Sequence, residues 1–318
     1  MYDFIIAGAG TYGKIMAFLL RRQGFKTLLI EKKSIKKTKL ENIVITNNTY
    51  IKLSQLLNID LSKFINKKIS EIHFNNINID TNVMVLNLEK LELHLIELYK
   101  KVKGKFIDKA NIQKYDYKNN QLIILNKKYR YKKLIAADGT LSEVRLNLTN
   151  KIQKFKFIIK VKNTKVNKDF IFKYNQNFKT IEKIIPTKGS NIITISNYKK
   201  KNKVFLNYIK IKEKYNYKSN LKNGYFIPNN DLLFNIKNIY FVGDASGLND
   251  PLTNISSNYN VIYIEKLLDY FTNNKNINYK KIKREITIKK IIKFLLYTPL
   301  INKLILKMVI KMYKEDLC

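Results

Sequence analysis

Residues 3–13 read Asp-Phe-Ile-Ile-Ala-Gly-Ala-Gly-Thr-Tyr-Gly, and this stretch decides the fold. Residues 3–7 form the short apolar run that is typical of a buried parallel strand. The glycine pattern GxGxxG follows at once, and residues 14–23 then have the apolar spacing of a helix with one buried face. A second strand is expected over 26–30 and ends at Glu31. This order of strand, glycine loop, helix, strand and acid predicts a Rossmann-like dinucleotide-binding unit.

Each glycine of the loop has a separate physical role. Gly8 permits the tight turn, Gly10 lets a pyrophosphate approach the backbone, and Gly13 lets the helix pack closely on the strand. The helix N-terminus presents N–H groups and partial positive charge to the phosphates. Glu31 can accept hydrogen bonds from an adenosine ribose, while Lys32 either lies along the adenine or is a solvated lysine. A glycine-rich turn without a ligand is the alternative, and the motif alone does not distinguish FAD from NAD.

A second informative stretch, residues 134–145, reads Leu-Ile-Ala-Ala-Asp-Gly-Thr-Leu-Ser-Glu-Val-Arg. An apolar strand runs into Asp138 and Gly139, a dipeptide that signals a turn. Ser142 and Arg145 follow, so the stretch has the pattern Asp-Gly-x-x-Ser-x-x-Arg.

A third stretch, residues 239–253, reads Ile-Tyr-Phe-Val-Gly-Asp-Ala-Ser-Gly-Leu-Asn-Asp-Pro-Leu-Thr. A buried strand delivers Gly243 and Asp244 at its carboxyl end, where ligands bind in open α/β sheets. A helix is expected from about 257 to 271 because the apolar residues there recur at helical spacing. The residues that can cap this helix are Asn254, Ser256 and Ser257.

Together the three stretches resemble the FAD-dependent oxidoreductases that have the para-hydroxybenzoate hydroxylase fold. Within that group, the run at 243–253 and the upstream Ile227-Pro228 are most similar to the geranylgeranyl reductase family. The resemblance implies an α/β fold, with a Rossmann-like FAD-binding domain, an interleaved antiparallel β-sheet substrate domain and a C-terminal helical segment. The expected parts are the first section of the FAD-binding domain at 1–150 with an insertion at about 36–85, the substrate domain at 151–235, the closing section of the FAD-binding domain at 236–275, and a basic helical segment at 276–318.

The resemblance also implies how FAD is held. The glycine loop would surround the pyrophosphate, Glu31 the adenosine ribose and Asp244 the ribityl chain. Amides near Ser256 and Ser257 would stabilise negative charge on the reduced ring. A turn acid at Asp244 and simple helix caps at the two serines are the alternatives. The expected cofactor-binding residues are Gly8, Gly10, Thr11, Tyr12, Gly13, Glu31, Lys32, Asp138, Gly139, Gly243, Asp244, Ser256 and Ser257.

The sequence departs from this family at positions expected near the flavin ring. A Lys-x-Cys-Gly-Gly type of loop is replaced by residues 39–43, which contain no Cys or Gly. Leu88 stands where relatives carry an Arg, and 254–257 read Asn-Ile-Ser-Ser in place of Gly-rich residues. Binding of the adenosine half is therefore the firmer expectation, and a divergent flavoprotein without catalysis is an open alternative. The sequence identifies no catalytic acid.

The strongly basic composition suggests a disordered basic tail or a nucleic-acid-binding protein, but the composition in detail favours neither class. The 318 residues include 61 Lys+Arg and 24 Asp+Glu, for a net charge of +37, but an apolar fraction of 45% excludes a disordered basic tail. Only five of the basic residues are arginine, the residue on which nucleic-acid readers depend, so a specific nucleic-acid partner is not expected. One cysteine, Cys318, excludes a disulfide framework, and two histidines, His73 and His94, predict no metal site.

The expected reaction is reduction of C=C bonds in an isoprenoid or polyprenyl lipid by hydride from reduced flavin. The electron donor, NAD(P)H or ferredoxin, is left open. One alternative is a flavin monooxygenase or hydroxylase on the same fold. Another is a basic protein without catalysis that uses its surface to bind nucleic acid or a membrane.

The expected location is the cytoplasm, with contact to a membrane surface as one open interpretation. The first strand follows Met1 directly, and no stretch of 18 uncharged apolar residues occurs, so neither a signal peptide nor a spanning helix is expected. Residues 301–314 form a basic amphipathic pattern, with Lys303, Lys307 and Lys311 on one helix face. Such a helix either lies on an anionic membrane or packs on the protein with its lysines in water.

Overall fold

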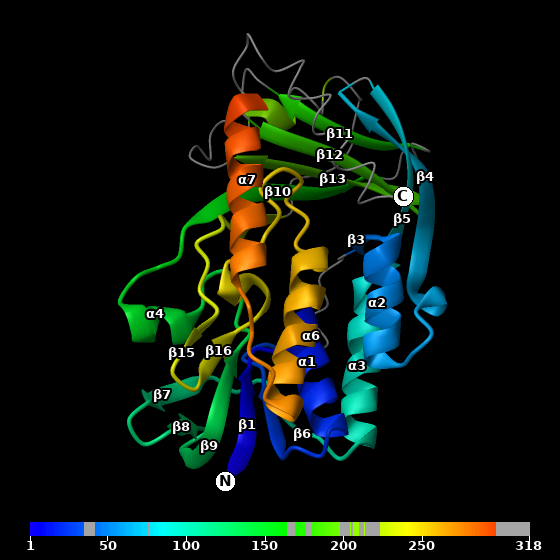
Figure 1. Cartoon of the computed structure of the whole chain (residues 1–318). Coiled ribbons are helices and arrows are strands. Elements are labelled where there is room, and N and C mark those ends of the chain that lie inside the picture. The colour runs from blue at the N-terminus through cyan, green and yellow to red at the C-terminus, as the bar shows by residue number, and fades with distance from the viewer. Residues whose placement is uncertain are drawn as a thin grey trace.

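The computed structural model contains two β-sheets placed end to end, with helices along one side (Figure 1). In the orientation of Figure 1 the sheet that begins the chain lies below and the second sheet lies above. The structure describes residues 1–34, 42–75, 77–163, 169–175, 180–197, 204, 206–209, 213 and 223–296.

The first sheet is the predicted Rossmann-like unit. Its main path runs β15-β16-β9-β1-β2-β6, and β1, β2, β6, β9 and β16 all pair in parallel. Apolar residues fill its short central strands, as expected for a parallel sheet that is covered on both faces. The strands of this path are β1 (Tyr2–Ala7), β2 (Thr27–Ile30), β6 (Lys105–Ile107), β9 (Lys127–Ala136), β15 (Asn235–Ile236) and β16 (Ile239–Phe241).

Three helices pack on one face of this sheet, and a hairpin and a short helix cover the other. The largest hydrophobic core lies beneath the three helices and includes Ile15, Leu95 and Ile264. The hairpin of β7 and β8 pairs with β9 and buries Leu122 and Ile124 against the opposite face. The covering elements are α1 (Thr11–Arg22), α3 (Leu88–Lys101), α6 (Ser257–Asn273), β7 (Ile112–Asp116), β8 (Gln121–Ile124) and α4 (Glu143–Thr149).

The second sheet has the order β14-β10-β13-β12-β11-β4-β5-β3. All neighbouring strands are antiparallel except β4 and β11, which are parallel. Three of its strands come from residues 42–87, so the sheet is larger than the 151–235 segment that the sequence assigns to it. Its strands are β3 (Asn42–Thr46), β4 (Ile65–Phe74), β5 (Ile77–Asn87), β10 (Phe155–Asn163), β11 (Phe170–Asn175), β12 (Thr180–Thr187), β13 (Ser190–Asn197) and β14 (Asn223–Pro228).

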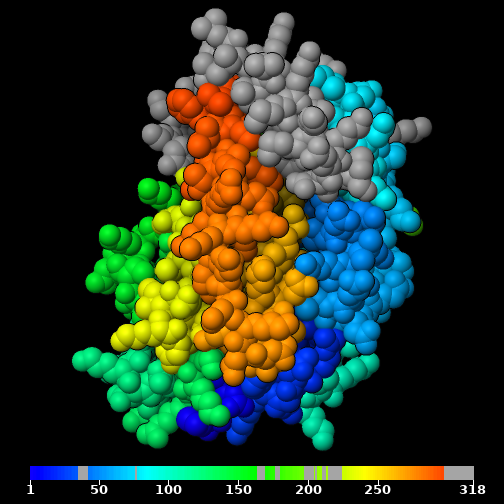
Figure 2. Space-filling view, in the orientation of Figure 1, coloured from blue at the N-terminus to red at the C-terminus, as the bar shows by residue number. Residues whose placement is uncertain are grey.

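The remaining helices pack against the two sheets and against the helices already described. Helix α7 crosses the inner face of the second sheet, where Ile292 and Leu296 enter the hydrophobic core. Figure 2 shows α6 and α7 as a continuous band across one face of the molecule, from the first sheet to the second. These elements are α2 (Asn47–Leu57), the 3₁₀ helices η1 (Ser62–Phe64) and η2 (Gly243–Ser246), and α7 (Lys280–Leu296).

The structure confirms the predicted fold class, a Rossmann-like domain interleaved with a largely antiparallel sheet. The predicted helix after the third stretch is α6, and Ser256 is its N-cap residue. The predicted basic helix at 301–314 lies outside the described residues. Within the described part of the chain, no helix is long and apolar enough to cross a membrane.

Candidate functional site

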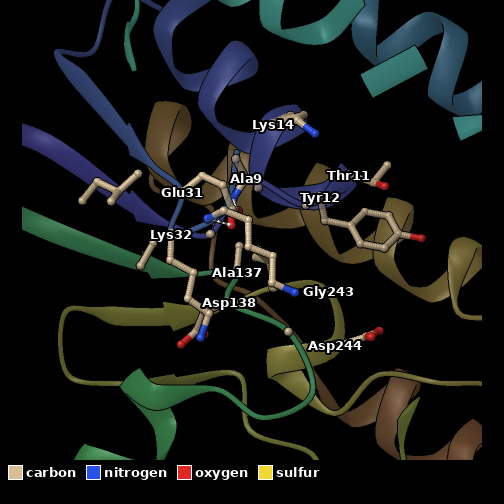
Figure 3. Close-up of a pocket in the computed structure, with 18 of the residues that line it drawn as sticks. Ala9, Thr11, Tyr12, Lys14, Glu31, Lys32, Ala137, Asp138, Gly243 and Asp244 are labelled. Atoms are coloured by element: carbon tan, nitrogen blue, oxygen red, sulfur yellow. Dashed lines mark hydrogen bonds between the residues drawn. The ribbon is translucent and has the colours of Figure 1, made fainter. Parts of the chain in front are cut away.

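A cavity of about 430 Å³ opens at the carboxyl ends of the parallel strands of the first sheet (Figure 3). Residues from all three predicted stretches line it, because β1, β9 and β16 are neighbours in the sheet. Every cofactor-binding residue expected from the sequence lines this cavity, with the exception of Ser257. Ser257 is buried instead and donates a hydrogen bond from Oγ to the carbonyl of Val44, 3.1 Å away.

The glycine loop has the geometry that its sequence predicts. Gly8 has a φ of +100°, and a Cβ there would overlap the backbone of Ala137. A Cβ at Gly13 would overlap the carbonyl oxygen of Gly8, so this glycine allows the close approach of α1 to β1. A Cβ at Gly10 would meet no atom within 4 Å. Gly8 and Gly13 are therefore needed by the fold, whereas Gly10 leaves open space beside the cavity.

The N-terminus of α1 faces the same open space. Gly10 is the N-cap residue and makes no side-chain capping bond, and the first turn contains no acidic residue. The first amides of a helix have no partner within the helix and carry partial positive charge. This end of α1 is thus suited to an anionic ligand such as a phosphate.

The carboxylate of Glu31 is fixed by two main-chain amides. The Ala9 amide donates to Oε2 at 2.8 Å, and the Lys33 amide donates to Oε1 at 2.9 Å. Each carboxylate oxygen can accept more than one hydrogen bond. Glu31 therefore braces the glycine loop and retains capacity to accept from the hydroxyl groups of a ligand.

Lys32 forms an ion pair with Glu143 at the beginning of α4, with 2.9 Å between Nζ and Oε1. Both side chains are substantially exposed, at 51% and 41%. The hydrogen bond from Lys32 to Glu143 raises the pKa of the lysine. This ion pair links the segment after β2 to the beginning of α4 at the cavity. Lys32 is therefore not a freely solvated lysine.

Asp138 has one carboxylate oxygen without a protein partner. Its Oδ2 accepts a hydrogen bond of 3.1 Å from the Val144 amide, whereas the buried Oδ1 has no hydrogen-bond partner in the described part of the chain. Burial raises the pKa of this carboxyl group. A buried acceptor without a donor is unfavourable, so this oxygen is suited to accept a hydrogen bond from a ligand in the cavity. A Cβ on the adjacent Gly139 would also meet nothing within 4 Å.

Asp244 is held by residues that the sequence did not indicate as part of the site. Thr140 donates from Oγ1 to Asp244 Oδ2 at 3.2 Å, and Gln153 donates to the Asp244 carbonyl at 3.0 Å. Buried Arg145 donates to Gln153 Oε1 at 2.9 Å and to the Ala245 carbonyl at 3.3 Å. The Arg of the Asp-Gly-x-x-Ser-x-x-Arg pattern thus ties the second stretch to the third and fixes the position of Asp244.

The Tyr12 side chain contributes to the site as well as its backbone. A Cβ at Gly243 would lie 3.0 Å from the Tyr12 ring, so the ring packs against the third stretch. Burial raises the pKa of the Tyr12 hydroxyl, and the nearby Asp244 carboxylate raises it further. The hydroxyl therefore stays protonated at neutral pH. The sequence predicted only main-chain contacts for Tyr12.

Lys14, Glu92 and Thr11 form a polar cluster that also lines the cavity. Lys14 is 4% exposed, and its Nζ lies 2.6 Å from Glu92 Oε2, while Thr11 Oγ1 donates to Glu92 Oε1 at 2.5 Å. In Figure 3 Lys14 points away from the side of the cavity that holds Asp138 and Asp244.

Two of the departures from the family pattern lie in the described residues. Leu88, the first residue of α3, lines the cavity with an apolar side chain. Asn254 has a φ of +55°, the left-handed conformation that favours glycine, and Asn tolerates it better than most residues. The loop before α6 therefore keeps a glycine-like backbone without glycine. Residues 39–41 of the remaining departure lie outside the described residues.

These features fit a dinucleotide. The open backbone at Gly10 and the N-terminus of α1 suit a pyrophosphate, and Glu31 suits a ribose. The Asp138 oxygen that has no partner among the described residues can accept from a ligand.

Comparison with solved structures finds the same fold in proteins whose sequences are less than 20% identical to this chain. A geranylgeranyl bacteriochlorophyll reductase-like protein from Thermoplasma acidophilum matches with a TM-score of 0.73 and 18% identity, over 97% of this chain and 90% of that one. PqsL of Pseudomonas aeruginosa, described as a probable FAD-dependent monooxygenase, matches with a TM-score of 0.69 and 14% identity, over 98% and 99%. The p-nitrophenol 4-monooxygenase PnpA of Pseudomonas putida matches with a TM-score of 0.74 and 13% identity, over 99% and 97%.

The chain has the para-hydroxybenzoate hydroxylase-type fold. The resemblance that the three sequence stretches carry is thereby confirmed at the level of the fold. No protein-family profile and no curated protein matches the sequence. The neighbours include a protein with a reductase-like name and two monooxygenases, so the fold is compatible with either reaction.

Proposed function

We propose that this protein is an FAD-dependent oxidoreductase. The observation that carries the proposal is the open face of Gly10 beside the Glu31 carboxylate, at the N-terminus of α1. At this point the glycine backbone leaves room for a phosphate, the helix N-terminus supplies partial positive charge, and Glu31 can accept from a ribose. A dinucleotide requires this combination. The FAD-dependent monooxygenase named among the structural neighbours favours FAD over NAD.

In this proposal each part of the cavity binds one part of the cofactor. The amides after Gly10 hold the pyrophosphate, and Glu31 accepts from the adenosine ribose. Asp244, fixed by Thr140 and Gln153, accepts from the ribityl hydroxyls. The N-terminus of α6 at Ser256 then lies beside the flavin ring. Its amides there would stabilise negative charge on the reduced ring.

When bound, FAD supplies the hydride-transfer chemistry. The chain supplies orientation: main-chain amides and the three loops that line the cavity would hold the cofactor in place. The Tyr12 hydroxyl, kept protonated by burial, is available as a hydrogen-bond donor beside Asp244.

We propose reduction of C=C bonds in an isoprenoid or polyprenyl chain as the reaction. Two observations support it: the similarity of residues 243–253 to the geranylgeranyl reductase family, and a structural neighbour named as geranylgeranyl bacteriochlorophyll reductase-like. The second candidate is a flavin monooxygenase, which is supported by PqsL and PnpA.

One pair of incubations separates these two reactions. Protein reconstituted with FAD and reduced with dithionite is incubated without oxygen with geranylgeranyl diphosphate or a polyprenyl alcohol. Loss of a double bond, measured by mass spectrometry, supports the reductase. An aerobic incubation with NAD(P)H and isotope-labelled dioxygen is the second arm, and label in an organic product contradicts the reductase and supports the monooxygenase.

A further inference from the structure

The inner face of the second sheet carries a row of polar side chains across three strands. Thr194 of β13 is directly opposite Lys160 of β10 on one side and Lys183 of β12 on the other. Residues that are directly opposite each other in an antiparallel pair point to the same face of the sheet. Lys156, four residues before Lys160 on β10, lies on this face too.

The loop before α6 covers this row. Lys156 Nζ donates to Asn254 Oδ1 at 2.7 Å, and Lys183 Nζ donates to the Thr253 carbonyl at 3.0 Å. Asn254 also donates to Ser196 Oγ at 2.7 Å. The same loop leads directly to Ser256 at the wall of the cofactor cavity. The lysines therefore lie beside the cavity, on the side of the second sheet.

Helix α7 adds two more lysines from the opposite side. Lys289 Nζ lies 3.0 Å from Asp250 Oδ2 and 3.5 Å from Glu285 Oε1, and half-buried Lys293 faces Lys156. Ile292 and Leu296 of α7 share a hydrophobic core with residues of β12 and β13, so this helix lies on the same face of the sheet. We define the lysine cluster as Lys156, Lys160, Lys183, Lys289 and Lys293.

Basic groups outnumber acidic groups in the buried part of this cluster. Lys156, Lys183 and Lys289 are 2%, 6% and 4% exposed, and Asp250, at 5%, is the carboxylate that is buried with them. Burying like charges together is costly unless an opposite charge compensates them. Burial and neighbouring lysines hold the pKa of Lys156 well below its usual range and lower the pKa of Lys183 to about 8.

Thr194 provides an independent indication of a ligand. It is 5% exposed, and its Oγ1 has no hydrogen-bond partner in the part of the chain that the structure describes. Its register places it between Lys160 and Lys183 on the face that carries the lysine cluster. A buried hydroxyl without a partner is unfavourable, so Thr194 Oγ1 is suited to a hydrogen bond with a ligand atom.

We propose that the lysine cluster and Thr194 bind an oxyanion of the substrate, a phosphate or a carboxylate, beside the flavin site. This inference rests on the proposed function, because it takes the inner face of the second sheet as the substrate side of the cofactor. Lysine ammonium groups recognise phosphate as point charges and suit an anion that several of them surround. The substrate is accordingly an anionic molecule, such as an isoprenoid diphosphate or an apolar acid, and not a neutral lipid.

The test is calorimetric titration of FAD-saturated protein with inorganic pyrophosphate and, separately, with benzoate. We expect saturable binding of one of these, and the tighter ligand identifies the oxyanion. Lys183→Gln and Thr194→Val should each weaken that binding by about tenfold, because each removes one hydrogen bond to a charged group. Lys128→Gln, which changes an exposed lysine of β9, is the matched control and should bind as the wild type does.

Proton uptake provides a readout that a purely structural cluster would not give. Lys183 and Lys293 have pKa values lowered to about 8, and a bound anion should raise both. The charged groups that face them are Lys156 and Lys160 of β10, Asp250 of the loop and Lys289 of α7. Titrations near pH 8 in buffers of different ionisation enthalpy should therefore show proton uptake on binding, and Lys183→Gln should reduce it.

The results separate failure of this inference from failure of the proposed function. Protein that takes up FAD but binds neither anion, or binds it equally well after Lys183→Gln, overturns the inference alone. Protein that takes up no FAD overturns the proposed function. In that event pyrophosphate is titrated into the flavin-free protein, where loss of binding in Lys183→Gln but not in Gly10→Val supports the lysine cluster and the reverse pattern contradicts it.

Discussion

The main-chain amide of Ala9 donates a hydrogen bond of 2.8 Å to Oε2 of Glu31, which joins the glycine loop to the end of β2. The same carboxylate accepts from the Lys33 amide through Oε1. One acidic side chain thus sets the shape of the loop and presents oxygen atoms to the cavity.

Replacement of Glu31 by Ala should weaken FAD binding by about tenfold or more, because a charged acceptor of hydrogen bonds is lost. Glu31→Gln keeps one acceptor oxygen and should lose less affinity. Quenching of flavin fluorescence in a titration gives both dissociation constants. Glu97→Ala, which removes an exposed carboxylate of α3 that does not line the cavity, is the control. Equal affinity in Glu31→Ala and the wild type would remove Glu31 from the site.

Gly10 and Gly13 should respond in opposite ways to replacement by Ala. A Cβ at Gly13 overlaps the Gly8 carbonyl, so Gly13→Ala should lower the free energy of unfolding by about 3 kcal/mol. A Cβ at Gly10 meets no protein atom, so Gly10→Ala should change stability by less than about 1 kcal/mol and weaken FAD binding instead. Urea unfolding and FAD titration measure the two effects. A large loss of stability in Gly10→Ala would show that the space beside it is not available to a ligand.

Asn254 should be replaced by Gly at lower cost than by Ala. Its left-handed backbone costs about 1 kcal/mol for a residue with a Cβ, and Gly avoids this cost. Both substitutions remove the acceptor of buried Lys156 and the donor to Ser196, so both should destabilise the protein. Chemical denaturation of Asn254→Gly and Asn254→Ala compares them directly. If Ala proves the more stable of the two, the loop does not depend on a glycine-like backbone.

The pH dependence of stability should reveal Lys183. Its pKa in the folded protein is lowered to about 8 from 10.5 by burial and by Lys160, so the unfolded chain binds more protons between these values. Stability should therefore rise as the pH increases from about 8 to 10.5, with a contribution from this one group of about 3 kcal/mol. Below pH 8 Lys183 is protonated in both the folded and the unfolded protein, so its unfavourable contribution to stability no longer changes with pH.

Lys183→Met tests this expectation with a side chain of similar size. Urea unfolding at several pH values should give a smaller rise between pH 8 and 10.5 in the variant than in the wild type, and a more stable variant at pH 7. An unchanged slope would mean that Lys183 is not buried in its charged form. The surface variant Lys128→Gln should keep the wild-type slope.

The sequence predicted the part of the site that local patterns determine. Glycine spacing and a following acid specify a strand, turn and helix, so Gly8, Gly10, Gly13 and Glu31 could be placed before the structure was known. The structure confirms the separate conformational needs of these glycines. Their assignment to FAD remains a prediction.

The interactions between distant stretches were not predictable in this way. Gln153 reaches Asp244 across 91 positions, and Lys14 reaches Glu92 across 78. Neither contact leaves a periodic pattern, because each depends on which strands become neighbours. For the same reason the sequence did not indicate that strands from 42–87 complete the second sheet.

Equilibrium titration of flavin-free protein with FAD shows whether the cavity at the glycine loop binds this cofactor. We expect saturation at one FAD per chain, with a flavin absorption spectrum shifted from that of free FAD. We also expect that Gly10→Val, which fills the open space beside the loop, abolishes binding while the protein keeps its thermal stability. Absence of FAD binding in the wild type, or undiminished binding in a folded Gly10→Val variant, would contradict the account.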